Sequence, residues 1–131
     1  MEQKNKKKIL VVDDELSVLE IYNAALSEAG FEVVTAADGE EGLQKTALEK
    51  PDLILLDISM PVMDGLTMMQ KLREKDDYGR KVPVVLLTNL SAGNEEIIKK
   101  VAQTEPVYYI TKSSVTIQEV VKKVEDCLAS I

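Results

Sequence analysis

Residues 53–57 read Leu-Ile-Leu-Leu-Asp, a run of four apolar side chains that ends in a carboxylate. A short run that is apolar at every position is typical of a strand covered on both faces, as in parallel sheets with helices on either side. Residues 9–12 (Ile-Leu-Val-Val) and 84–87 (Val-Val-Leu-Leu) have the same character. The sequence therefore predicts a parallel sheet with an acidic side chain at the end of one central strand.

Amphipathic stretches separate the apolar runs, so strands and helices are predicted to alternate along the chain. The predicted strands are 9–12, 32–36, 53–56, 82–87 and 107–110, and the predicted helices are 16–29, 40–49, 66–73, 94–102 and 117–128. Residues 32–35 alternate polar and apolar side chains, which favours an edge strand. Right-handed crossovers then give an α/β, doubly wound sheet of five parallel strands with helices on both faces.

Turn and capping residues mark the ends of several of these elements. Gly30 is predicted to end the first helix. Asp38 and Asp64 are predicted N-caps, and residues 116–119 (Thr-Ile-Gln-Glu) form a capping box that opens the last helix. The predicted helix ends therefore agree with the hydrophobic pattern.

The composition limits the classes of function. A chain of 131 residues with 45% hydrophobic residues predicts one globular domain over residues 8–131, after a polar tail over residues 1–7. We expect no output domain in it. The net charge of −7 argues against nucleic-acid binding by this domain. With one cysteine and no histidine, zinc sites and histidine-based triads are excluded, and we expect a cytoplasmic protein without a membrane segment.

Polar side chains follow the predicted strands at one edge of the sheet. Asp13 and Asp14 follow the first strand, Asp57 the third, Thr88 the fourth and Lys112 the fifth. Ligands of such sheets bind at the carboxyl ends of the strands, and each separation exceeds the dozen residues that a parallel crossover needs. These five side chains are therefore predicted to face one crevice.

Three carboxylates in one crevice repel one another, by roughly 4 kcal/mol for each close pair, so a cation is expected among them. Carboxylate oxygens with few other ligands suit Mg²⁺, or Mn²⁺, completed by water and a substrate phosphate. Lys112 supplies a second positive charge, and Thr88 can donate a hydrogen bond to a phosphate oxygen. Asp57, on a buried central strand, is the predicted nucleophile of an aspartyl phosphate.

With these residues in place, the chain resembles the receiver domain of two-component response regulators, and in particular its single-domain, chemotaxis-type members. The stretch 57–65 (Asp-Ile-Ser-Met-Pro-Val-Met-Asp-Gly) looks like the loop that follows the family's phosphoacceptor. The resemblance spans the whole chain. It implies a flavodoxin-like fold with the strand order 2-1-3-4-5.

The resemblance also implies the partners and the roles of further residues. A histidine kinase or histidine phosphotransfer domain would supply the phosphoryl group. Mg²⁺ would bind Asp13, Asp14, Asp57 and the backbone carbonyl of Ser59. Tyr109, with Thr88, would switch the face built from the fourth helix, fifth strand and fifth helix toward a downstream protein. The chain would then not be a turnover enzyme, beyond accepting the phosphoryl group and slowly losing it.

Two positions and one segment depart from the family pattern. Asn89 stands where most relatives have alanine or glycine, which affects access to the phosphoacceptor or the phosphate lifetime. Ser113 replaces the usual proline after the lysine, so that loop lacks a backbone constraint. Residues 104–107 (Thr-Glu-Pro-Val) replace a glycine-alanine pair before the fifth strand, and we expect them to reshape the surface beside the fourth helix.

Three other classes of function share some of these sequence features. A pseudo-receiver would bind partners without phosphorylation. A phosphatase of the haloacid dehalogenase type also forms an aspartyl phosphate, but it places a second aspartate where this chain has Ser59. A flavin-binding domain is disfavoured by the acidic residues 13–15 (Asp-Asp-Glu). Cys127 is predicted to be a buried helix residue without a redox role. The methionines Met60, Met63, Met68 and Met69 are predicted to fill gaps in the core or to lie on a loop, without a cofactor.

Overall fold

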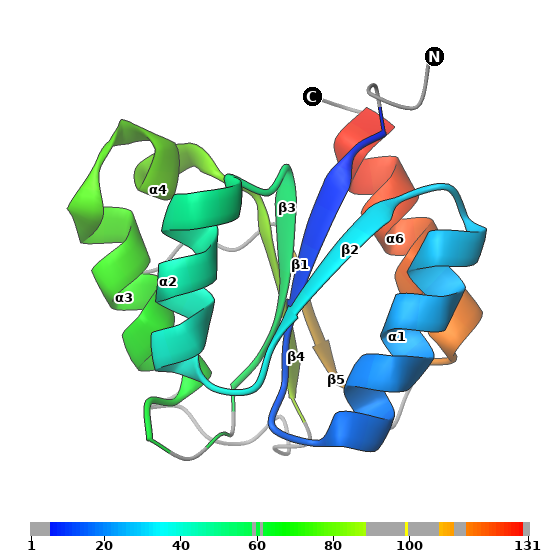
Figure 1. Ribbon diagram of the computed structural model, residues 1–131, viewed down its shortest axis with the longest axis horizontal. Coiled ribbons are helices and arrows are strands. Elements are labelled where there is room, and N and C mark those ends of the chain that lie inside the picture. Colours follow the sequence, from blue (N-terminus) through cyan, green and yellow to red (C-terminus); the bar gives the residue numbers. More distant parts are fainter. Residues whose placement is uncertain are drawn as a thin grey trace.

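The computed structural model describes residues 6–58, 60, 62–88, 99, 108–111 and 115–129. Within these ranges, five parallel strands form one sheet in the order β2-β1-β3-β4-β5 (Figure 1), as predicted. The strands are β1 (Lys8–Val12), β2 (Glu32–Ala36), β3 (Leu53–Asp57), β4 (Val84–Thr88) and β5 (Tyr108–Thr111). β2 lies at the edge, as its alternating sequence predicts.

Helices cover both faces of the sheet. They are α1 (Leu16–Glu28), α2 (Gly39–Glu49), α3 (Gly65–Lys75), α4 (Asp77–Lys81) and α6 (Ile117–Ala129). Figure 1 shows α1 and α6 on one face, and α2 and α3 on the other. The predicted helix over residues 94–102 lies outside the described residues, apart from Lys99. None of the described helices has the length and apolar character needed to cross a membrane.

The sheet separates two hydrophobic clusters because successive side chains of a strand point to opposite faces. In β1, Leu10 and Val12 pack with α2 and α3, whereas Ile9 and Val11 pack with α1 and α6. β3 and β4 alternate in the same way. All the apolar residues of β1, β3 and β4 are at most 2% exposed, which explains why their sequences are apolar throughout.

The methionines predicted for the core or a loop, and Cys127, are fully or partly buried. Met68 and Met69 are fully buried in the α3 cluster, and Met60 and Met63 pack against it. Cys127 is buried between α6 and the sheet, and this burial raises the pKa of its thiol. Cys127 is therefore a buried helix residue, as predicted, and the methionines divide between the core and the loop before α3, the two alternatives predicted for them.

The predicted helix ends are also confirmed. Gly30 follows α1 with φ of 101°, a left-handed conformation that glycine adopts without strain. Asp38 caps α2 by accepting a hydrogen bond from the Glu41 N–H at 2.9 Å, and Asp64 caps α3 by accepting one from the Thr67 N–H at 2.8 Å. In the capping box of α6, the Glu119 N–H donates to Thr116 Oγ1 at 3.1 Å.

The short helix α4 was not predicted. It lies between α3 and β4, and Asp76 caps it by accepting from the Gly79 N–H at 2.7 Å. Arg73 of α3 donates to the carbonyl oxygens of Gly79 and Val82, at 2.8 and 2.7 Å. The Val82 N–H bonds within α4, to the Tyr78 carbonyl, and Pro83 has no N–H, so β4 begins at Val84 and not at residue 82.

Candidate functional site

Three carboxylates meet at the carboxyl edge of the sheet, as predicted. Asp13 and Asp14 follow β1, and Asp57 ends the neighbouring strand β3. One carboxylate oxygen of each residue lies within 4.8 Å of those of the other two. Asp13 and Asp57 are buried, at 1% and 5% exposure, whereas Asp14 is exposed. Two buried acids and one accessible acid therefore surround one point.

Backbone pairing positions the two buried acids. The Asp13 N–H donates to the Ala36 carbonyl at the end of β2, at 3.1 Å. One side-chain oxygen of Asp13 accepts from the Glu15 N–H at 3.0 Å, which fixes the carboxylate. On the other strand, Asp57 lies opposite Leu87, and the Ile58 N–H donates to the Leu87 carbonyl at 3.1 Å. Both side chains thus project from well-paired ends of central strands.

The charge of this cluster favours a small, hard cation. Two carboxylates about 4 to 5 Å apart repel each other by about 3 to 4 kcal/mol at an effective dielectric constant near 20. Mg²⁺ and Mn²⁺ bind carboxylate oxygens at about 2.1 Å, so oxygens that share one ion come within about 4 Å of each other. The observed spacing is close to this value. The donor set and its geometry therefore fit such an ion.

The loop after Asp57 is folded back on its own start. Gly65, the first residue of α3, donates its N–H to the Ile58 carbonyl at 2.8 Å. A Cβ at Gly65 would lie 2.2 Å from the Asp57 carbonyl oxygen, so only glycine allows this approach. Val62, in the same loop, has φ of 67° and is 78% exposed. A left-handed conformation is unusual for a β-branched residue.

A second glycine touches this loop from another element. Gly39, the first residue of α2, donates its N–H to the Met63 carbonyl at 3.2 Å. The sequence pattern predicts no individual role for Gly39 or Gly65. The signal for Gly39 would be a glycine directly after the N-cap Asp38, where helix formation alone does not require one.

The remaining predicted site residues are described only in part. Thr88 ends β4, next to the strand of Asp57, and pairs with Thr111 of β5. Tyr109 lies in β5 opposite Leu86. The other predicted positions lie outside the described residues: Ser59, Asn89, Lys112, Ser113 and the segment 104–107.

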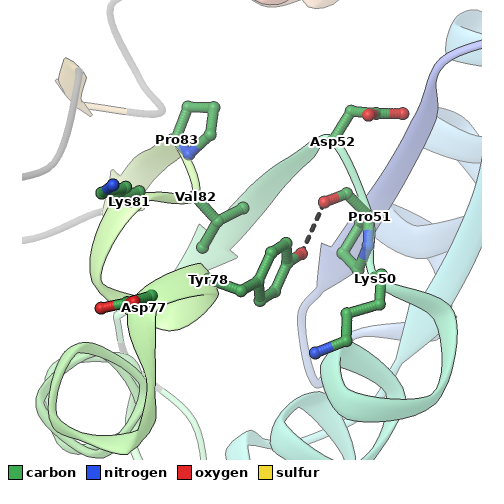
Figure 2. Close-up of a pocket in the computed structure, with 8 residues that line it drawn as sticks. All are labelled: Lys50, Pro51, Asp52, Asp77, Tyr78, Lys81, Val82 and Pro83. Carbon is green, nitrogen blue, oxygen red and sulfur yellow. Dashed lines mark hydrogen bonds between the residues drawn. The ribbon is translucent and has the colours of Figure 1, made fainter.

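An open hollow of about 370 Å³ lies at the opposite edge of the sheet, where β3 and β4 begin. It is lined by Lys50, Pro51, Asp52, Asp77, Tyr78, Lys81, Val82 and Pro83 (Figure 2). The Tyr78 hydroxyl donates to the Pro51 carbonyl at 2.5 Å, and Lys50 Nζ lies 4.7 Å from the centre of the Tyr78 ring. Burial raises the pKa of Tyr78.

This hollow is separate from the carboxylates. The five residues of β3 lie between Asp52 and the end of the strand at Asp57, and a strand rises about 3.3 Å per residue, so the two are roughly 15 Å apart. Tyr78 joins α4 to the turn before β3. The contacts of the hollow therefore fasten α4 to the sheet.

The chain is similar in sequence to proteins named as transcriptional regulators. The chain is 52% identical over 86 residues to "Probable transcriptional regulator ycf27" of Cyanophora paradoxa, a match covering 66% of this chain and 34% of that protein. It is 44% identical over 93 residues to the alkaline phosphatase synthesis transcriptional regulatory protein PhoP of Bacillus subtilis, covering 71% and 36%. The match thus spans about a third of the length of these relatives.

Solved structures agree over nearly the whole chain. A CheY-like response regulator receiver domain protein from Methanospirillum hungatei has a TM-score of 0.86 and 27% identity, with 96% of each chain covered. The chemotaxis protein CheY4 of Vibrio cholerae has a TM-score of 0.83 and 28% identity, covering 92% of this chain and 98% of the other. The sequence model of the family described as "Response regulator receiver domain" matches residues 9–125 of this chain. The chain therefore belongs to the response regulator receiver domain family.

Proposed function

We propose that this chain is a phosphoacceptor switch of a two-component system, in which Asp57 takes a phosphoryl group from a phosphohistidine. One observation carries the proposal. In a receiver-family chain, the Asp57 carboxylate ends a central strand within 4.8 Å of two further carboxylates, Asp13 and Asp14. The phosphodonor would be a histidine kinase or a histidine phosphotransfer domain.

The reaction requires little beyond alignment and charge neutralisation. A carboxylate oxygen of Asp57 attacks the phosphorus atom, and the bond from phosphorus to the donor's imidazole nitrogen breaks. The imidazole leaves with that electron pair, and Asp57 carries a mixed anhydride. Mg²⁺, when bound, supplies positive charge that offsets the negative charge of the acids and of the moving phosphoryl group.

The protein's own residues divide the remaining tasks. Asp13, Asp14 and the Ser59 carbonyl would hold the ion together with Asp57. Lys112 and Thr88 would contact phosphoryl oxygens. Each transfer modifies the protein once and slow hydrolysis resets it, so the chain is a switch and not a turnover enzyme.

The output would be a change in protein binding. Recruitment of Thr88 and reorientation of Tyr109 would alter the face formed by the fourth predicted helix, β5 and α6. Inverting a switch from 1:99 to 99:1 requires about 5.5 kcal/mol, a magnitude that a few charge-assisted hydrogen bonds can supply. Because the named relatives include transcriptional regulators and a chemotaxis protein, we propose a downstream target that acts in transcription or in chemotaxis.

Intact-mass measurement tests the phosphoacceptor. After incubation with acetyl phosphate and Mg²⁺, we expect one phosphoryl group on the wild type and none on Asp57→Ala. Asp126→Ala is the matched control, because it removes an exposed aspartate of α6 and leaves the cluster intact. It should be labelled like the wild type.

The same experiment separates the alternatives. Absence of label on the wild type, or equal labelling of Asp57→Ala, contradicts the proposal and favours a pseudo-receiver. Continuous release of phosphate from an added phosphomonoester would instead indicate a phosphatase.

A further inference from the structure

The β2–α2 turn, taken here as residues 36–39, contacts the two chain segments that carry the carboxylate cluster. On one side, the Ala36 carbonyl at the end of β2 accepts a hydrogen bond from the Asp13 N–H. On the other side, Gly39 donates its N–H to the Met63 carbonyl in the loop that follows Asp57. The same short turn therefore contacts the loop that begins at Asp13 and the later part of the loop that follows Asp57.

Only a glycine permits the second contact. A Cβ on residue 39 would lie 2.5 Å from the Met63 carbonyl oxygen and 3.0 Å from both Cβ and Cγ of Met63. The first of these atoms is backbone, which cannot rotate away. Among the described glycines, only Gly30 has a positive φ, so Gly39 is not required for an unusual backbone conformation. Glycine is required at position 39 because the backbones of residue 39 and Met63 approach each other closely.

Hydrogen bonds to α2 and β2 hold the turn in place. Asp38 accepts from the Glu41 N–H at 2.9 Å, and Glu41 in turn accepts from the Ala37 N–H at 2.7 Å. Lys45 donates to the Thr35 carbonyl at 2.5 Å, which ties α2 to the end of β2. A residue larger than glycine at position 39 would therefore force the turn and the Met63 carbonyl apart.

One residue of the loop after Asp57 has a backbone conformation that its residue type disfavours. Val62 has φ of 67°, a conformation that a β-branched residue keeps only when its surroundings enforce it. Its neighbour Met63 is the residue that Gly39 contacts, and the next residue, Asp64, caps α3. The loop is thus fixed at Met63, Asp64 and Gly65 while it turns through Val62.

We infer that Gly39 is a positioning residue for the ion site: its contact with Met63 sets the loop that begins at Asp57 in the arrangement that binds Mg²⁺. The inference rests on the proposed function, in which this loop supplies both Asp57 and a backbone carbonyl to the ion. Gly39 acts through the loop and touches neither the ion nor the phosphoryl group.

The test compares Gly39→Ala with Gly42→Ala, one helical turn further along α2. A Cβ at Gly42 would meet the far end of the flexible Met68 side chain, at 2.8 Å from Sδ and 3.0 Å from Cε, and Val12 Cγ1 at 3.3 Å. These three nearest atoms all belong to side chains, so this site tolerates alanine more easily. Calorimetry without phosphodonor gives the Mg²⁺ affinity. The rate of labelling by acetyl phosphate is then measured across a range of Mg²⁺ concentrations.

For Gly39→Ala we expect Mg²⁺ affinity to fall at least fivefold, while the labelling rate at saturating Mg²⁺ stays within twofold of the wild type. For Gly42→Ala both quantities should stay within twofold. If Gly39→Ala binds Mg²⁺ as tightly as the wild type, the role of Gly39 is wrong while the proposed function stands. The same holds if Gly39→Ala and Gly42→Ala lose Mg²⁺ affinity equally. If the wild type takes up no Mg²⁺, the proposed function fails as well.

A measurement on the wild type keeps the inference testable if Gly39→Ala does not fold. Nuclear magnetic resonance follows hydrogen exchange of the glycine amides. Mg²⁺ should slow exchange of the Gly39 amide at least threefold, because the ion fixes its acceptor loop. The Gly30 amide, bonded to the Ser27 carbonyl at the end of α1, is the internal control. Unchanged exchange at Gly39 on ion binding overturns the inference.

Discussion

Asp13 combines a structural and an electrostatic role within one side chain. One of its oxygens accepts the Glu15 N–H, and its carboxylate lies in the cluster with Asp14 and Asp57. A hydrogen bond needs only an acceptor oxygen, whereas ion binding uses the negative charge. Asparagine keeps the first property and removes the second, so this substitution separates the two roles.

We expect Asp13→Asn to raise the free energy of unfolding by roughly 1 to 3 kcal/mol in Mg²⁺-free buffer, because it removes repulsion between buried carboxylates. Urea unfolding in the presence of a chelator measures the change. Asp38→Asn is the control: it also removes one negative charge, and asparagine caps a helix as well as aspartate does. An equal gain in both variants would show that only net charge matters.

Tyr78 offers a pH-dependent test at the other edge of the sheet. Burial raises the pKa of its hydroxyl above the ordinary value of 10.0. The folded state therefore prefers the neutral phenol, so the stability that Tyr78 contributes is complete below pH 10 and is lost as the pH rises through 10 toward the folded-state value.

Replacing Tyr78 with phenylalanine removes the hydrogen bond to the Pro51 carbonyl, which should cost about 1 kcal/mol of stability at pH 7. Since phenylalanine cannot ionise, the difference between wild type and Tyr78→Phe should shrink as the pH rises above 10. Urea unfolding of both proteins at pH 7, 10 and 11 measures it. A difference that stays constant to pH 11 would contradict the role of burial.

At the scale of elements, α6 begins with a reciprocal pair of hydrogen bonds. The Thr116 N–H donates to Glu119 Oε1 at 2.8 Å, and the Glu119 N–H donates to Thr116 Oγ1 at 3.1 Å. These bonds satisfy two backbone donors that the first turn of the helix leaves free. The start of α6, whose inner face packs on the sheet, is therefore defined by side chains.

Thr116→Ala should lower the free energy of unfolding by about 1 kcal/mol, because it leaves the Glu119 N–H without its side-chain acceptor. Thermal or urea unfolding measures the loss. Gln118→Ala, at an exposed neighbouring position, should change stability by less than about 0.5 kcal/mol. If the two substitutions cost the same, the capping box does not stabilise α6.

The element α4 shows what local sequence cannot predict. Its residues 77–81 (Asp-Tyr-Gly-Arg-Lys) have no apolar periodicity and include a glycine, which lowers helix propensity. The helix forms because Arg73 binds two carbonyl groups and Tyr78 binds the turn before β3. These are contacts between elements, and they become apparent only when the fold is known. The longer helices, by contrast, follow from periodicity and caps.

At the scale of the whole molecule, the topology explains why much of the site was predictable. Apolar runs identify central parallel strands, and parallel strands bring their carboxyl ends to one edge. The meeting of Asp13, Asp14 and Asp57 follows from these two facts. The contact of Gly39 with Met63 does not, because it depends on the distance between two loops, which no periodicity encodes. Close backbone approaches therefore form the unpredicted part of the site.

The buried position of Cys127 has a practical consequence for following this molecule in solution. A shielded thiol with a raised pKa reacts slowly with alkylating reagents, and the chain has no other cysteine and no tryptophan. A cysteine placed at the exposed Val62 would therefore be labelled selectively by a maleimide dye. Its fluorescence would report directly on the loop beside the carboxylates, without interference from any native indole.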